Sequence, residues 1–229
     1  MKSPIDPNRD QLYAFSKGEK FEGEEMNTVF LKIFEERGWD LEEDAESVSG
    51  IGSNSEQTAE IVRRFPRLLD TYGVETLLDL PCGDFNWMQK LDWSGRNYIG
   101  GDIVPQIISK NRTKFDHPNI RFVELDLTSS VLPKADVILC RDCLVHLSFA
   151  DIHKALANIK RSELTYLLIT TFPEQPFNKD IVTGGWRPLN FELAPFHFPK
   201  PLALINEKCT ELGDTFRDKS LGLWKVADL

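Results

Sequence analysis

Five short apolar runs, separated by helical or loop segments, dominate the middle of the chain. They cover residues 76–81, 97–102, 120–127, 135–140 and 166–172. Each has the length of one buried strand, and apolar residues recur at helical spacing between several of them. This alternation is typical of a parallel sheet covered by helices. Two later segments, 202–208 and 220–227, are expected to complete the sheet. The sequence therefore predicts an α/β fold with three layers and a doubly wound, mostly parallel, seven-stranded sheet.

The amino-acid composition limits the partners and compartments that we expect for this chain. The 229 residues fit one core, and 36 acidic against 27 basic residues give a net charge of −9. This charge argues against nucleic acid as the main partner. The first thirty residues lack a signal-peptide pattern, and no apolar run is long enough to span a membrane. Four irregularly spaced cysteines indicate a reducing compartment. We therefore expect a cytoplasmic protein without a membrane or nucleic-acid partner.

Acidic residues follow the first two predicted strands. Asp79 and Asp84 flank a loop with a single glycine, and Asp102 lies 19 residues beyond Gly83. Because the carboxyl ends of parallel strands meet at one edge, these acids are expected to share a site. The Asp102 carboxylate can accept hydrogen bonds from the two hydroxyls of a ribose. A diphosphate would be repelled by the acidic loop, whose single glycine also gives it little close access to backbone amides. The pattern predicts a cationic, nucleoside-containing cofactor and disfavours a nicotinamide dehydrogenase.

The segment DLPCGDFNWM, from Asp79 to Met88, resembles motif I of the class I S-adenosylmethionine-dependent methyltransferases, in particular a bacterial branch. The resemblance covers about residues 76–172, although Pro81 and Phe85 replace two usual glycines. It implies that Asp79, Gly83 and Asp84 flank the methionine part of S-adenosylmethionine and that Asp102 binds the ribose. By the same resemblance, other candidate cofactor contacts are Pro81, Cys82, Trp87, Ile103, Asp126, Leu127 and Arg141, with Asp126 and Leu127 at the adenine. Trp87 is alternatively a core residue.

His146 is the preferred general base, because neutral imidazole accepts a proton at cellular pH. Asp142, four residues earlier, is expected on the same helical face, where it would orient the imidazole. His197 is the rival base, and a core role for His146 stays open. Asp142 and His146 alone do not make a metal site, since no third ligand is evident, so no metal is expected.

Residues 173–201 combine six prolines with large aromatics. They form either a lid over the site or a surface insertion whose aromatic side chains complete the core. On the first interpretation Trp186, Arg187 and Asn190 bind the substrate, Arg187 through a carboxylate or phosphate. Residues 1–55 are expected to form an arm and helix that cover the cofactor, and residues 56–229 the methyltransferase domain.

The resemblance implies methyl transfer from S-adenosylmethionine, with S-adenosylhomocysteine as product. We expect the acceptor to be oxygen or nitrogen of a small polar metabolite, with a sugar or sugar-containing precursor as one class. The alternatives are a peptide or protein acceptor, attracted by the acidic N-terminal region, and a non-catalytic cofactor-binding protein.

Overall fold

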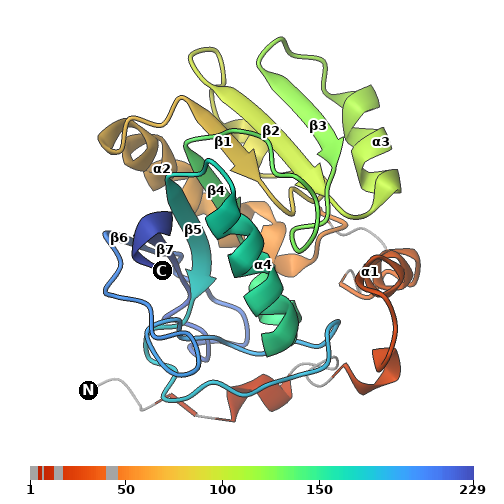
Figure 1. The fold of residues 1–229 in the computed structure, drawn as a ribbon, viewed down its shortest axis with the longest axis vertical. Helices are drawn as coiled ribbons and strands as arrows, with labels where there is room; N and C mark the ends of the chain where they lie inside the picture. Colours follow the sequence, from red (N-terminus) through yellow and green to blue (C-terminus); the bar gives the residue numbers. More distant parts are fainter. Residues whose placement is uncertain (1–4, 7, 13–17, 40–45) are drawn as a thin grey trace.

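The computed structural model describes residues 5–6, 8–12, 18–39 and 46–229, and its centre is one sheet (Figure 1). The strands are β1 (Thr76–Asp79), β2 (Asn97–Asp102), β3 (Ile120–Glu124), β4 (Val137–Cys140), β5 (Tyr166–Thr171), β6 (Ala203–Asn206) and β7 (Ser220–Lys225). Their order across the sheet is β3-β2-β1-β4-β5-β7-β6. Strands β1 to β5 run parallel, and β7 runs antiparallel to both β5 and β6. The predicted mostly parallel, seven-stranded sheet is confirmed.

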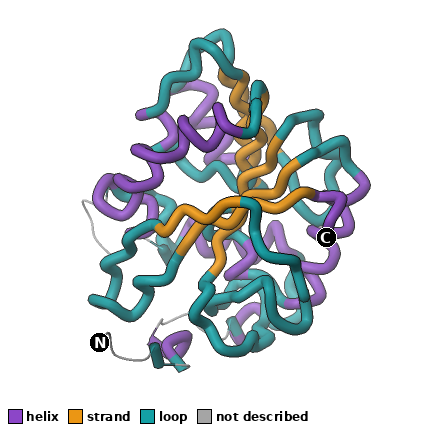
Figure 2. The backbone as a smooth tube through the Cα atoms, turned by 90° about the vertical axis from the view of Figure 1, so that its left-hand side faces the viewer, coloured by secondary structure: helices purple, strands orange, loops and turns teal. Residues whose placement is uncertain are grey.

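Helices lie on both sides of this sheet, as the edge-on view in Figure 2 shows. They are α1 (Met26–Glu35), α2 (Ser55–Thr71), α3 (Pro105–Lys114) and α4 (Phe149–Arg161). Local chemistry sets their beginnings. Pro105 starts α3, where its fixed φ suits the first helical turn. The Ser148 hydroxyl caps α4 by accepting a hydrogen bond from the Asp151 amide at 3.2 Å.

Two hydrophobic clusters cover the two faces of the sheet. Because side chains alternate along a strand, neighbours in β1 point to opposite faces. Leu77 packs with Phe65 of α2, whereas Leu78 packs with Ile152 of α4. All four of these side chains are fully buried. The sheet is therefore the middle of three layers, and its carboxyl edge stays free to carry a site.

Residues 173–201 are built into this core. Leu189 and Phe191 are fully buried in the cluster that contains α4, and the Phe172 amide donates a hydrogen bond to the Leu189 carbonyl at 2.7 Å. In Figure 1 the segment winds around the lower end of the molecule. The aromatic side chains complete the core, which favours the second of the two interpretations of this segment.

The N-terminal arm is anchored by Arg9, which the sequence did not single out. Its guanidinium is fully buried and binds Asp218 at 2.6 Å and Gln175 at 3.0 Å. It also faces the rings of Phe172 and Phe216. The described residues 8–12 are therefore held by Arg9 against the loop that precedes β7. Among the described residues, no helix combines the length and the apolar character needed to cross a bilayer.

Candidate functional site

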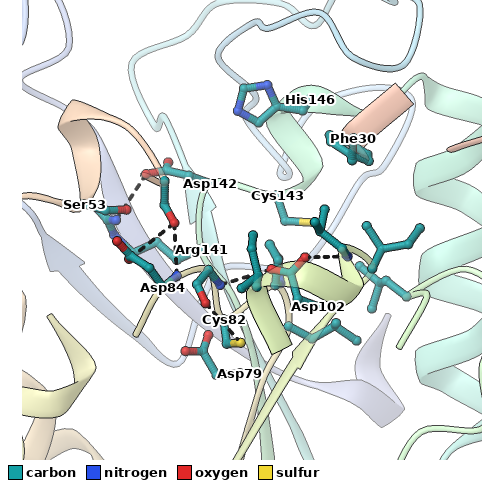
Figure 3. Close-up of a pocket in the computed structure, with 18 of the residues that line it drawn as sticks. Phe30, Ser53, Asp79, Cys82, Asp84, Asp102, Arg141, Asp142, Cys143 and His146 are labelled. Carbon is teal, nitrogen blue, oxygen red and sulfur yellow. Dashed lines mark hydrogen bonds and ion pairs between the residues drawn. The ribbon is translucent and has the colours of Figure 1, made fainter. Parts of the chain in front are cut away.

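A cavity opens at the carboxyl edge of β1, β2 and β4 (Figure 3). The empty space within it, open mouth included, is about 1070 Å³. Nearly all predicted cofactor contacts line it, namely Asp79, Pro81, Cys82, Gly83, Asp84, Trp87, Asp102, Ile103, Leu127 and Arg141. Parallel strands end at the same edge, and that geometry brings these residues from separate parts of the sequence into one place.

Asp79 and Asp102 lie at the base of the cavity and are 3% and 4% exposed. Asp102 Oδ2 accepts a hydrogen bond from the Gly83 amide at 3.1 Å, and Oδ1 accepts one from the Val104 amide at 3.0 Å. Burial raises the pKa of Asp79 to about 7 and that of Asp102 to about 6, although hydrogen bonds to each carboxylate oppose the shift. Two desolvated carboxylates of this kind are stabilised by a cationic ligand.

An apolar surface adjoins Asp102. It consists of Ile103, Val104, Ile107, Leu125, Leu127 and Leu147, with Met26 and Phe30 of α1. This surface suits a flat ring of low polarity. The predicted adenine contact Asp126 is absent from the lining, because its carboxylate binds the hydroxyls of Thr128 and Ser129 at 2.7 and 2.9 Å. Asp126 stabilises a turn there, and only Leu127 of the predicted pair lines the cavity.

Residues 46–54 cross the loop that follows β1. The Asp84 carboxylate accepts hydrogen bonds from the Ser47 hydroxyl and the Val48 amide, both at 3.0 Å. A Cβ atom on Gly83 would lie 2.2 Å from the Ser49 hydroxyl, so this close crossing requires glycine. Asp84 was expected to flank the methionine part of the cofactor. Its carboxylate fastens this crossing segment, and Asp84 also lines the cavity, so its contact with the cofactor stays a prediction.

A cluster of charges lies beside the cavity at the end of β4. Arg141 binds Glu207 at 2.8 Å and the Gly52 carbonyl at 2.7 Å. Asp142 binds Lys219 at 2.7 Å. Burial opposes ionisation of Asp142, but Lys219 and Arg141 together keep its pKa below the usual range. Glu207 and Lys219 come from the antiparallel end of the sheet, so no local motif pointed to them.

The predicted helical face shared by Asp142 and His146 does not exist. Asp142 has a φ of +49°, which interrupts a right-handed helix, and only residues Leu144–His146 form a short 3-10 turn. Asp142 binds Thr170 and Lys219. The ring of His146 bonds through Nδ1 to the Gly185 carbonyl at 2.7 Å. The expectation that Asp142 orients the imidazole by sharing its helical face was wrong.

His146 nevertheless lines the cavity. A carbonyl can only accept, so Nδ1 carries the proton and Nε2 is left as an acceptor. Burial lowers the pKa of His146 to about 4, despite the Gly185 carbonyl and Asp142, which favour the charged form. The Trp39 ring lies edge-on to the imidazole, with centroids 6.0 Å apart. In Figure 3 the imidazole lies at the top of the view, far from Asp79. A neutral base with a fixed tautomer therefore borders the cavity.

The other predicted acceptor contacts lie elsewhere. His197 is exposed and is not among the described residues that line the cavity. Trp186 packs between Phe172 and Phe216 in the core. The side-chain amide of Asn190 binds the carbonyls of Pro173 and Gln175 at 3.1 and 3.2 Å. The structure corrects these assignments, because a loop's composition does not reveal which of its polar groups serve its own folding.

Arg187 is likewise a structural residue. It is 1% exposed, and its guanidinium donates hydrogen bonds to the carbonyls of Leu144, Leu147 and Lys179 at 2.9, 2.6 and 3.1 Å. Burial lowers its pKa to about 9, so the side chain stays charged at neutral pH. These bonds hold the 3-10 turn that ends at His146.

We expect Arg187→Ala to lower the free energy of unfolding by about 3 kcal/mol, because buried carbonyls lose charged donors. For a chain of this size this corresponds to a melting temperature about 10 °C lower. Arg121→Ala, at an exposed strand position, is the control, with an expected change below about 0.5 kcal/mol. Thermal and urea unfolding measure both, and an unchanged stability for Arg187→Ala would restore the substrate role.

Residues 77–162 match a family described as "Methyltransferase domain". The chain carries a methyltransferase domain of the class I fold. The chain is also similar in fold to human N-acetylserotonin methyltransferase in complex with S-adenosylmethionine, with a TM-score of 0.58 and 15% identity. That similarity covers 89% of this chain and 60% of the human enzyme's chain.

Two more solved structures share the fold of this methyltransferase domain. Magnesium protoporphyrin IX methyltransferase from Synechocystis PCC 6803, with bound S-adenosylhomocysteine, gives a TM-score of 0.51 at 17% identity over 65% of this chain and 73% of that one. The methyltransferase domain of bacterial CtHen1-CN gives 0.53 at 12% identity over 74% of this chain and 99% of that one. No curated protein matches the sequence. At these identities the likeness concerns the fold.

Proposed function

We propose that this chain transfers a methyl group from S-adenosylmethionine to oxygen or nitrogen of a small polar acceptor, with His146 as general base. The proposal rests on one observation: a single cavity is lined by two buried carboxylates, an apolar surface and a neutral histidine. The match of residues 77–162 to methyltransferase domains supports it.

The residues present fit this cofactor. Asp102 lies where its carboxylate can accept hydrogen bonds from a ribose diol, and Ile103 and Leu127 offer apolar contact to a purine. Asp79 and Asp102 supply negative charge for a ligand with a sulfonium and an ammonium group. When bound, the sulfonium supplies an activated methyl group. Arg141 is the one arginine or lysine among the described lining residues, and Glu207 already neutralises it. A diphosphate would thus meet repulsion.

The acceptor side of the site is formed by Trp39, Asp142 and His146. Trp39 follows α1 and offers an aromatic surface that excludes water. His146 Nε2 takes the proton that a hydroxyl or ammonium acceptor must lose. Holding the acceptor in line contributes more than proton removal, since favourable positioning is worth about 7–11 kcal/mol. We propose that the described part of residues 1–55 covers the cofactor site, because Met26, Phe30 and Trp39 all line the cavity. Residues 1–4, 7, 13–17 and 40–45 of this predicted arm lie outside the described residues.

Two measurements test the function. Isothermal titration calorimetry should detect S-adenosylhomocysteine at micromolar concentration, and no heat at millimolar ligand would overturn the proposal. Labelled S-adenosylmethionine, offered with a panel of hydroxyl and amine metabolites and a panel of basic peptides, then identifies the acceptor. Methylation of peptides alone would replace the small-molecule acceptor by the peptide alternative.

Cofactor binding should depend on pH. A cation favours the ionised carboxylates, whose pKa values in the free protein are about 7 for Asp79 and about 6 for Asp102. Affinity for S-adenosylmethionine should therefore rise at least about tenfold from pH 5.5 to pH 8, with protons released on binding. Titrations at pH 6.5 in buffers of different ionisation enthalpy measure this release. A pH-independent affinity would show that neither carboxylate faces the cationic part of the ligand.

A further inference from the structure

Tyr98 forms a hydrogen bond with the Asp79 carboxylate at the base of the cavity. The Tyr98 hydroxyl donates a hydrogen bond to Asp79 Oδ2 at 2.6 Å. Among the described residues no other donor forms a hydrogen bond with this carboxylate. Tyr98 itself is completely buried and does not line the cavity, so it reaches the site only through Asp79.

The strands hold Tyr98 in the position that this bond requires. Asp79 pairs with Gly100 in the parallel register, so Tyr98 starts two residues back along β2. Its ring must extend over Gly100 to reach the carboxylate. A Cβ atom on Gly100 would lie 2.6 Å from a ring carbon of Phe122 and 3.0 Å from one of Tyr98, so glycine leaves the space that both rings occupy. The rings of Phe85 and Trp93 hold Tyr98, each with its centroid 4.8 Å away.

We propose that Tyr98 is a positioning residue for cofactor binding: its hydroxyl fixes the Asp79 carboxylate and stabilises its ionised form, which receives the cationic part of S-adenosylmethionine. This inference rests on the proposed function. The bond occupies Oδ2 and leaves Oδ1 for the ligand. Without the hydroxyl, Asp79 would be a buried carboxyl group with no hydrogen bond from the described residues, and such a group is largely protonated at neutral pH.

The other groups around Asp79 do not replace the tyrosine. Asp102 raises the pKa of Asp79 by repulsion, and Arg141 lowers it by attraction. Cys82 and Cys140 also face it, and burial raises the pKa of both thiols, so they stay neutral. Burial and Asp79 raise the pKa of Tyr98 as well, so its hydroxyl remains a donor at any working pH.

The test uses Tyr98→Phe, which removes only the hydroxyl. Titration with S-adenosylmethionine from pH 5.5 to pH 9 should show the midpoint of the affinity profile about one unit higher than in the wild type. At pH 7 the affinity should be about fivefold lower, and at pH 9 the two proteins should agree within about twofold. Tyr72→Phe is the control, because its hydroxyl bonds the Leu202 carbonyl at 3.1 Å, outside the cavity.

A loss of the same size at every pH would reveal a merely structural role and overturn the inference, as would an unchanged profile. If Tyr98→Phe does not fold, 3-fluorotyrosine at position 98 keeps the ring and strengthens the donor, so the midpoint should move downward. A midpoint that stays fixed with fluorotyrosine also overturns the inference. In an Asp79→Asn background, Tyr98→Phe should no longer shift the profile. Absence of binding by the wild type would instead refute the proposed function.

Discussion

Asp102→Ala is expected to weaken binding of S-adenosylhomocysteine about 100-fold. The ionised carboxylate accepts hydrogen bonds in a buried site, where a charged acceptor is worth about 1.5–3 kcal/mol for each bond. The same carboxylate also holds the amides of Gly83 and Val104. Alanine therefore removes the proposed ribose contact and the two hydrogen bonds that hold the loop after β1. Titration calorimetry measures the loss directly.

Two variants separate these effects. Asp102→Asn keeps an oxygen acceptor for one of the amides and loses the charge, so we expect about a tenfold loss. Asp126→Ala removes the acid at the end of the next strand, whose carboxylate binds only its own turn among the described residues. The affinity of Asp126→Ala should stay within about twofold, because the proposed cofactor position does not reach Asp126. If Asp126→Ala weakened binding as much as Asp102→Ala, our placement of the cofactor would be wrong.

His146→Gln should reduce kcat about 100-fold on the identified acceptor and leave affinity for S-adenosylhomocysteine within about threefold. Glutamine can still donate a hydrogen bond to the Gly185 carbonyl, but it cannot take up a proton. General bases contribute roughly 10²–10⁴-fold. We expect the lower end of that range, because a pKa of about 4 lies far below the operating pH.

The pH dependence of the same reaction gives a second readout. In the proposed mechanism the neutral imidazole is the active form, so kcat should fall as the pH drops through about 4 and stay constant above pH 5. His197→Gln is the matched control, since this exposed histidine lies outside the cavity-lining residues of the described chain. A kcat for His146→Gln equal to that of the wild type would leave positioning alone as the source of catalysis.

The architecture was predictable because its signals are local. Each buried strand appears as its own apolar run, and Pro105 and Ser148 mark helix beginnings through their own backbone chemistry. Asp79 and Asp102 were predictable for a topological reason. Once the strands are parallel and neighbouring, residues at their carboxyl ends must lie at the same edge.

The acceptor side was not predictable in this way. Spacing alone placed Asp142 on a helix with His146, but the Asp142 side chain pairs with Lys219, which lies 77 residues further along the chain. Arg187 looked like an anion-binding residue, yet it serves the carbonyls of the turn that carries His146. Long-range partners of this kind leave no periodic pattern near either residue.

The sequence by itself determined the order of strands and helices, the acids at the strand ends and, through them, the edge where a cation can bind. Only the tertiary structure decided which polar groups serve the site and which serve the fold. The physical reason is desolvation, because a buried charge or carbonyl must be paired. Its partner is either a ligand, as we propose for Asp102, or a distant part of the chain, as for Arg187. Packing in three dimensions decides between the two.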